Sequence, residues 1–126
     1  NIEIKNGSKN GIKILINALT TANKHQLVKF IYSSFNKGVM NYLSSTKQYI
    51  SYLIKNMDDF KQLNITDQTK AQFIGISHEH ATPLIFEHLK KIKISAGIYF
   101  KNKNQYVTNI DKVINNDIIS CIFIED

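Results

Sequence analysis

Apolar residues in the first half of the chain recur at intervals of three and four, which is the spacing of one face of a helix. The first such set follows Asn10-Gly11 and consists of Ile12, Leu15, Ile16 and Leu19. This pattern predicts a helix, although the short run from Ile12 to Ile16 is also compatible with a strand.

Two further helices are predicted where a polar capping signature precedes an apolar face. Asn23-Lys24-His25-Gln26 has the form of a capping box, and so does Ser45-Thr46-Lys47-Gln48. The face after the first box consists of Leu27, Val28, Ile31 and Phe35 and ends at Gly38. The face after the second box consists of Tyr49, Ile50, Leu53, Ile54 and Met57. We therefore expect residues 1–62 to be mainly helical.

The second half of the chain shows short β-type runs. Phe73-Ile74-Gly75-Ile76 predicts a strand, and Thr82-Pro83 places an N-cap before a proline at the first helical position. This pair predicts a short helix over 83–91. Further strands are expected at 93–100, 105–108 and 117–125, with 101–104 as the turn between the first two of them.

These elements fit one domain of 126 residues, which is long enough for one hydrophobic core but too short for two. The expected fold class is α+β, with the N-terminal helices packed on a small antiparallel sheet of about four strands. The longest apolar runs are far shorter than the roughly 20 residues of a membrane span, so no membrane-spanning segment is expected. The chain starts at Asn1 without an initiator methionine or a signal region, which indicates a processed product or one domain of a longer protein.

The net charge of +6 is unevenly distributed along the chain. Residues 1–57 hold eight lysines and one acidic residue, whereas residues 58–126 hold eight lysines and nine acidic residues. A second basic stretch, 88–110, has no acidic side chain and interleaves lysines with Tyr99, Phe100 and Tyr106. Lysines beside aromatic rings suit a phosphate backbone with stackable bases, while an ordinary role of the lysines in solubility stays open.

The candidate active site lies between the predicted strand and the predicted short helix. His78 and His80 precede a helix N-terminus, where backbone amides and the helix dipole attract anions. In an extended segment, residues i and i+2 point the same way, so both imidazoles would face one ligand and Glu79 would face the other side. Two imidazoles beside a phosphate suit transesterification of RNA, one as the base and one as the acid. Glu79 is an alternative base or fixes one imidazole tautomer, and neither a metal nor a cofactor is required.

Five further residues are candidates for contact with the phosphate. Thr82 and Ser77 could donate to a non-bridging oxygen, and Lys90, Lys91 and Lys93 are the nearest lysines after the histidines in sequence. Two other interpretations of the histidine pair stay open. A His-x-His pair can bind a transition metal when a third ligand is present, and loop histidines often serve as caps or surface hydrogen bonders.

A basic domain of this size, with a helical first part, a short helix and about four antiparallel strands, resembles the C-terminal toxin domains of contact-dependent inhibition and related polymorphic toxin systems. More narrowly, it looks like the barnase, EndoU, colicin and RelE type of ribonuclease toxin. The resemblance rests on architecture and charge over most of the chain. It implies metal-independent cleavage of RNA, often transfer RNA, in the cytoplasm of a target cell after export from the producer. It also implies an acidic immunity protein that covers the active face.

One departure from the toxin pattern is the complete lack of arginine. A lysine would have to contact the phosphate in its place, without the bidentate geometry of a guanidinium. Two alternatives to the ribonuclease follow from the same sequence. One is a non-catalytic nucleic-acid-binding domain that uses the lysine clusters, and the other is a protein-interaction domain that docks through its front helices.

Overall fold

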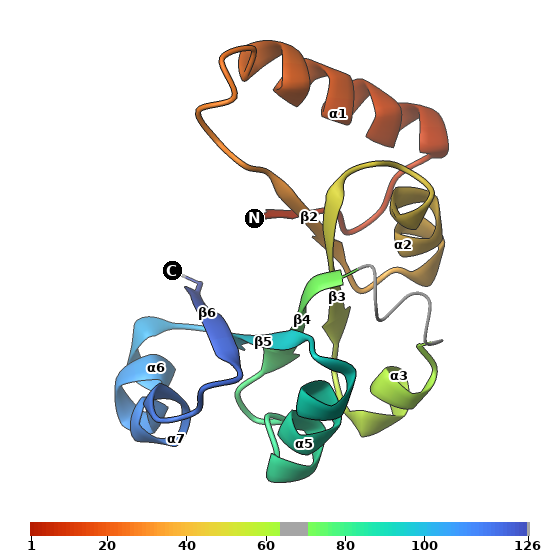
Figure 1. Cartoon of the computed structure of the whole chain (residues 1–126). Coiled ribbons are helices and arrows are strands. Elements are labelled where there is room, and N and C mark those ends of the chain that lie inside the picture. The colour runs from red at the N-terminus through yellow and green to blue at the C-terminus, as the bar shows by residue number, and fades with distance from the viewer. Residues whose placement is uncertain (64–70, 126) are drawn as a thin grey trace.

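The computed structural model describes residues 1–63 and 71–125, and it is an α/β structure built on one curled, all-parallel sheet of six strands (Figure 1). The strands are β1 (Ile2–Glu3), β2 (Ile31–Ser34), β3 (Tyr49–Ile54), β4 (Ala71–Ser77), β5 (Ser95–Phe100) and β6 (Ile119–Ile124). The helices are α1 (Lys9–Ala22), α2 (Lys37–Ser44), α3 (Met57–Lys61), α5 (Pro83–Ile92), α6 (Lys103–Asn109) and α7 (Asp111–Ile114).

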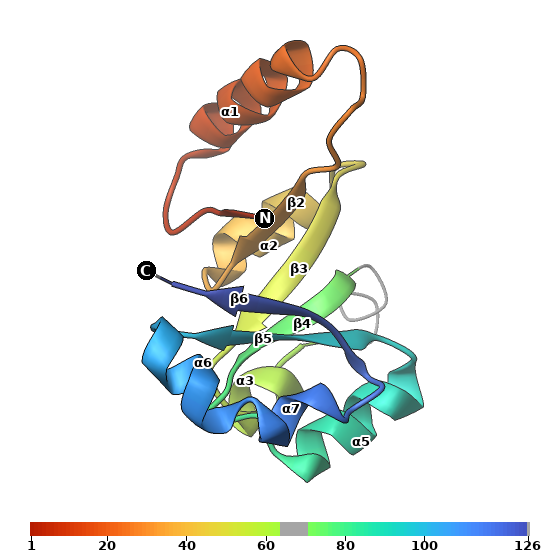
Figure 2. The ribbon, with the colours of Figure 1, turned by 90° about the vertical axis from the view of Figure 1, so that its left-hand side faces the viewer.

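The strands follow one another in the sheet in the same order as in the sequence. Each neighbouring pair is parallel, and helical segments connect the strands. Parallel crossovers are almost always right-handed, so a sheet that always advances in one direction places its helices on one side. Helices α2, α3, α5, α6 and α7 lie around the outside of the arc (Figures 1 and 2). The result is a half-barrel with a convex, helix-covered face and a concave inner face.

The main hydrophobic core lies between the convex face and the helices. Alternate residues of the central strands are buried there, because successive side chains of a strand point to opposite faces. The strand residues of this core include Ile50, Tyr52, Ile54, Ile74, Ile76, Ala96, Ile98 and Phe100. The helices contribute Met40 and Leu43 from α2 and Ile85 and Leu89 from α5, each of them no more than 1% exposed.

Part of the concave face, around Phe73, is filled by close packing between strands. Phe73 is only 4% exposed, although it lies on the opposite face of β4 from Ile74 and outside the main core. A Cβ atom on Gly97 would lie 2.7 Å from the Phe73 ring and 2.9 Å from the sulfur of Cys121. Glycine at this position therefore lets the Phe73 ring lie against the neighbouring strand.

Helix α1 packs less closely than the other long helices. It lies at one end of the molecule, beyond β2 and α2 (Figure 2). Only Ile12 and Ile16 are buried on it, while Ile14 is 61% exposed. The predicted helix in this region is confirmed, and Ser8 caps it by accepting a hydrogen bond from the amide of Gly11.

The predicted α+β class with a four-strand antiparallel sheet is wrong, because every strand pair of the described sheet is parallel. Within residues 1–62, the second and third predicted helices are wrong, because their apolar faces contain β2 and β3. Strands of a parallel sheet are buried on both faces and read as short continuous apolar runs. Such a run lacks the alternation that marks a half-buried strand, and over six residues it resembles part of a helix face.

The two predicted capping boxes are helix ends instead of helix starts. Asn23 is the C-cap of α1, and its side chain amide bonds both backbone groups of Val28 in the following loop. Ser45 is the C-cap of α2, where its hydroxyl donates to the carbonyl of Tyr42. Short polar side chains form hydrogen bonds with the backbone at either end of a helix. The four-residue signature therefore did not show whether a helix begins or ends there.

The second half of the chain agrees better with the sequence pattern. Strands β4, β5 and β6 lie where strands were expected, and α5 begins at Pro83 with Thr82 as its N-cap. The strand predicted over 105–108 is wrong, because these residues belong to α6. Asn102 caps this helix by accepting from the amide of Gln105 at 2.9 Å, which starts a helix in a stretch of high β-propensity.

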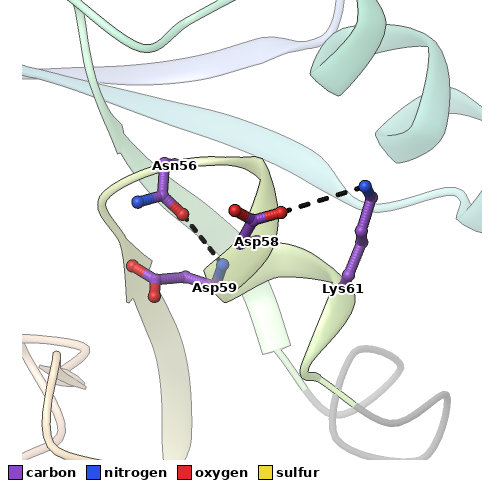
Figure 3. Close-up of polar contacts among 4 residues, drawn as sticks. All are labelled: Asn56, Asp58, Asp59 and Lys61. Carbon is purple, nitrogen blue, oxygen red and sulfur yellow. Dashed lines mark hydrogen bonds and ion pairs between the residues drawn. The ribbon is translucent and has the colours of Figure 1, made fainter.

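An asparagine cap recurs at the carboxyl ends of three strands. Asn36, Asn56 and Asn102 follow β2, β3 and β5 by two residues, and each caps the next helix. Figure 3 shows the cap of α3, where the side chain oxygen of Asn56 accepts from the amide of Asp59 at 3.0 Å. In the same view, Asp58 and Lys61 form an exposed ion pair at 3.9 Å. These caps make the connections at this edge short, so the loops that follow the strands are held close to the sheet.

Candidate functional site

The candidate site lies at the edge of the sheet where the carboxyl ends of the parallel strands meet. In barrels and open sheets of parallel strands, ligands bind at this edge, because the loops there carry free backbone amides and adjacent strands bring distant residues together. In this chain the edge carries His78 and Glu79 after β4 and Lys101 after β5. Strands β4 and β5 are neighbours in the sheet, so these side chains come from adjacent positions.

The histidine loop is a tight turn and not an extended segment. Residues 78–80 form the turn, closed by a hydrogen bond from the amide of His80 to the carbonyl of Ser77 at 2.9 Å. The amide of His78 donates to the carbonyl of Tyr99 and so continues the ladder between β4 and β5. The i and i+2 argument, in which both imidazoles face one ligand, therefore does not apply to this geometry.

The two imidazoles have different surroundings. His78 is partly buried, and its ring is stacked on Phe100 with the centroids 4.7 Å apart and the planes at 21°. Its Nδ1 atom is buried and has no hydrogen-bond partner among the described residues. His80 is exposed, as is Glu79. The ring of His78 is thus held in one orientation by the core, whereas His80 can move in solvent.

Lys101 is the lysine that the fold brings to the histidine loop. Its ammonium nitrogen lies 3.8 Å from a carboxylate oxygen of Glu79, and both side chains are substantially exposed. An exposed pair of this kind contributes little to stability, on the order of 0–1 kcal/mol. It does, however, hold a cation beside the loop of His78 and His80.

Two of the residues proposed to contact phosphate have structural roles in the loop. The hydroxyl of Thr82 accepts from the amide of Ile85 at 3.4 Å and caps α5. Ser77 is only 4% exposed, and its hydroxyl lies beside the phenol of Tyr99. Burial raises the pKa of Tyr99, and Glu125 and Glu3 raise it further, while the nearby Ser77 hydroxyl lowers it. Tyr99 therefore lies in a region of negative potential.

The structure does not bring Lys90, Lys91 and Lys93 to the histidine loop. They lie at the C-terminal end of α5, and a helix of ten residues separates its two ends by about 15 Å. Lys90 instead pairs with Asp117 at 2.8 Å, and this contact lowers the pKa of the Asp117 carboxyl. Lys93 ends the helix in a left-handed conformation with φ of 57°.

The sequence pattern placed Lys101 and Tyr99 in the basic, aromatic stretch 88–110 but did not indicate that they lie near the histidine loop. A usable signal exists in the sequence. Lys-Asn follows the strand at Lys55-Asn56 and again at Lys101-Asn102, and Phe-Asn follows it at Phe35-Asn36. Because asparagine caps the next helix in each case, the residue before it marks the carboxyl edge of the sheet.

Within residues 1–63 and 71–125, no group of three or more His, Cys, Asp or Glu side chains is arranged to hold a metal ion. In the same part of the chain, no helix is long and apolar enough to cross a membrane. Comparison with protein-family models, with curated proteins and with solved structures gives no match in any of the three searches.

Proposed function

We propose that the carboxyl edge of β4 and β5 is a metal-independent ribonuclease site. His78, Glu79 and His80 supply the acid and the base, and Lys101 supplies the positive charge beside the phosphate. The observation that supports the proposal is the contact of 3.8 Å between Lys101, which follows β5, and Glu79, because a cation then lies beside the loop that contains both histidines.

The reaction is an in-line transesterification. A base takes the proton of the ribose 2′-hydroxyl, the 2′-oxygen forms a bond to phosphorus, and the bond from phosphorus to the 5′-oxygen breaks. An acid protonates the leaving 5′-oxygen, so the proton lost from the 2′-hydroxyl is balanced by the proton gained by the 5′-oxygen. The products are a 2′,3′-cyclic phosphate and a free 5′-hydroxyl. The Lys101 ammonium offsets the charge that develops on the phosphorane oxygens.

In the proposed reaction, the two histidines and Glu79 have different tasks, which follow from their different surroundings. The fixed ring of His78 provides a proton-transfer group with a set orientation, because Phe100 lies against its face. The exposed His80 and Glu79 provide the second group. This division replaces the symmetric pair expected from an extended loop.

The test is incubation of the purified chain with total RNA in EDTA, followed by gel electrophoresis of the products. We expect His78→Gln and His80→Gln to abolish the cleavage given by the unmodified chain. His25→Gln is the matched control, because His25 is an exposed histidine in the loop between α1 and β2. Cleavage that survives in both site variants would overturn the assignment of the site.

A toxin role, with RNA in the cytoplasm of a target cell as its substrate and an acidic immunity protein as its partner, belongs to the same proposal. The net charge of +6 supports it, since a basic enzyme is attracted both to RNA and to an acidic inhibitor. The second candidate function is nucleic-acid binding without turnover. It is favoured by the basic first part of the chain, which has no acidic residue between Glu3 and Asp58. Salt-dependent RNA binding by an inactive wild-type chain would support this alternative.

A further inference from the structure

Helix α1 carries more apolar surface than the rest of the protein covers. Ile12 and Ile16 are its buried residues. Ile14 is 61% exposed, and Leu15 and Ala18 are exposed as well. With 3.6 residues per turn, these three side chains occupy a strip of about 100° that continues the buried face around the helix. The apolar face of α1 is therefore covered over only part of its width.

The loop that follows α1 exposes two further aliphatic side chains. Leu27 is 85% exposed, the largest fraction among the large apolar side chains of the described residues, and Val28 is 57% exposed. Both backbone groups of Val28 are hydrogen-bonded to the side chain of Asn23. The aliphatic pair is thus exposed on a turn that its own hydrogen bonds hold in place.

These apolar side chains form a group at one end of the molecule. Helix α1 and residues 23–30, here called the N-terminal arch, lie beyond β2 and α2 (Figures 1 and 2). Within residues 1–63 and 71–125, four of the nine exposed large apolar side chains lie in this arch. Single exposed apolar residues are common on protein surfaces, whereas a group of them indicates a contact surface.

The same arch is purely basic. It has no acidic residue, and it contains four exposed lysines, namely Lys9, Lys13, Lys24 and Lys29. None of the four forms an ion pair with a carboxylate of the described residues. Lys24 and Lys29 lie on either side of Leu27-Val28 in the sequence, and Lys29 also lies over the ring of Tyr49. A complementary partner therefore has negative charge and an apolar layer next to it.

We propose that the N-terminal arch binds the surface of an anionic lipid bilayer. Leu27 and Val28 enter the boundary between headgroups and acyl chains, and the lysines lie beside the anionic headgroups. Lysine-rich amphipathic elements bind membrane surfaces in this way, because burial of aliphatic groups and attraction to the headgroups act together. The histidine loop is not part of this surface, so the inference goes beyond RNA cleavage and does not depend on it.

The composition of the arch favours a lipid surface over an acidic protein or RNA. Interfaces between proteins are depleted in lysine and enriched in aromatic residues, methionine and arginine. Single-stranded RNA binds where aromatic rings stack on its bases. The exposed large apolar side chains of the arch are all aliphatic, namely Ile14, Leu15, Leu27 and Val28.

Insertion is tested by tryptophan fluorescence, because the chain contains no tryptophan of its own. The full chain with Leu27→Trp is mixed with phosphatidylglycerol vesicles, with and without brominated acyl chains. Leu84→Trp is the matched control, since Leu84 is 54% exposed on α5, at the opposite end of the molecule (Figures 1 and 2).

We expect the emission of Leu27→Trp to shift to shorter wavelength and to be quenched by the brominated lipid, and the emission of Leu84→Trp to stay unchanged. Phosphatidylcholine vesicles should give no shift with either variant. An equal response of the two variants would contradict insertion of the arch. No response of either variant would overturn the proposal and favour an acidic protein as the partner.

Affinity is tested by sedimentation of the tryptophan-free chain with phosphatidylglycerol vesicles. Leu27→Ser should weaken binding by on the order of tenfold, because an aliphatic side chain is no longer buried. Lys24→Gln should weaken it about fivefold, which corresponds to about 1 kcal/mol for one lysine near an anionic surface.

Leu84→Ser and Lys91→Gln, both on α5, are the controls and should leave binding nearly unchanged. An equal loss with Lys24→Gln and Lys91→Gln, together with no loss with Leu27→Ser, would show a general attraction of net charge and overturn the proposal. Unchanged circular dichroism spectra establish that each variant is folded.

Discussion

The ring of Phe35 contacts the ring of Tyr99 edge to face, with centroids 6.0 Å apart and planes at 83°. Phe35 directly follows β2 and Tyr99 belongs to β5, so β3 and β4 lie between their strands. Three strand spacings amount to about 14 Å in a flat sheet. The contact therefore reports the curvature of the half-barrel, which also brings the carboxylates of Glu3 and Glu125, from the two outermost strands, near the phenol of Tyr99.

Replacing Glu125 by Gln should lower the pKa of Tyr99. Burial is the largest cause of the raised pKa, and Glu125 is the next, so the variant should move it toward its ordinary value without reaching it. The protonated phenol is favoured in the folded chain. This preference for the protonated phenol therefore contributes fully to folding stability below the pKa of an unfolded tyrosine. The contribution is lost as the pH rises through the pKa of Tyr99 in the folded chain. NMR titration of ¹³C-labelled tyrosine measures the change, and an unchanged pKa would place Glu125 elsewhere.

Replacing Gly97 by Ala should destabilise the fold by about 1–3 kcal/mol, the usual effect of overpacking a closed site. The new methyl group would meet the Phe73 ring and the sulfur of Cys121 at less than 3 Å, and the Phe73 ring is buried and cannot move away. Gly11→Ala is the control. Its Cβ would have only an ordinary contact at 3.4 Å, and alanine favours the helix α1 by about 1 kcal/mol. Urea unfolding should show opposite signs for the two variants, and equal stability would contradict the close packing of the inner face.

Replacing Asn36 by Ala should lower the free energy of unfolding by about 0.5–2 kcal/mol. The variant loses the cap of α2, in which the Asn36 side chain accepts from the amide of Val39 at 3.1 Å, and the bond to Asn6 at 3.2 Å. Asn41→Ala, at an exposed position of the same helix, should have no destabilising effect. Thermal unfolding followed by circular dichroism distinguishes the two, and a similar loss in both variants would exclude a specific cap.

Replacing Lys101 by Met should reduce the RNA cleavage that we propose by on the order of 100-fold, which is typical for the loss of one group that stabilises the transition state. Lys91→Met removes an equal charge from the far end of α5 and should change cleavage by less than about threefold at physiological salt, since only the general attraction to RNA is weakened. Values of kcat/KM for the two variants give the comparison. An equal decrease of kcat/KM in both variants would show that Lys101, like Lys91, contributes only to non-specific attraction of RNA.

How far the sequence predicts this fold depends on which signals are local. Thr82-Pro83 predicts the start of α5 because a capping side chain followed by proline acts within one turn. Tyr49, Ile50, Leu53 and Ile54 have helical spacing, yet they form β3, because both faces of this strand are covered by the rest of the structure. Such short apolar runs do not show whether neighbouring strands pair in parallel or antiparallel, so the parallel sheet could not be predicted from the sequence.

The candidate site was only partly predicted from the sequence, because only some of its features depend on local signals. The location of His78, Glu79 and His80 in a loop before a helix followed from local signals. The partner of the loop did not, because Lys101 comes from the next strand and is 22 positions from Glu79 in the sequence. Nearness in sequence favoured Lys90 instead, and α5 carries it to the other end of the sheet.

The most direct test of the central claim, RNA cleavage at the carboxyl edge of β4 and β5, is ³¹P NMR of a mixture of dinucleoside monophosphates incubated with the chain in EDTA. The signal of a 2′,3′-cyclic phosphate should appear with the unmodified chain and with His25→Gln, and it should be absent with a chain that carries both His78→Gln and His80→Gln. A mixture that stays intact with the unmodified chain, or a cyclic product that forms equally with the double variant, would contradict the claim.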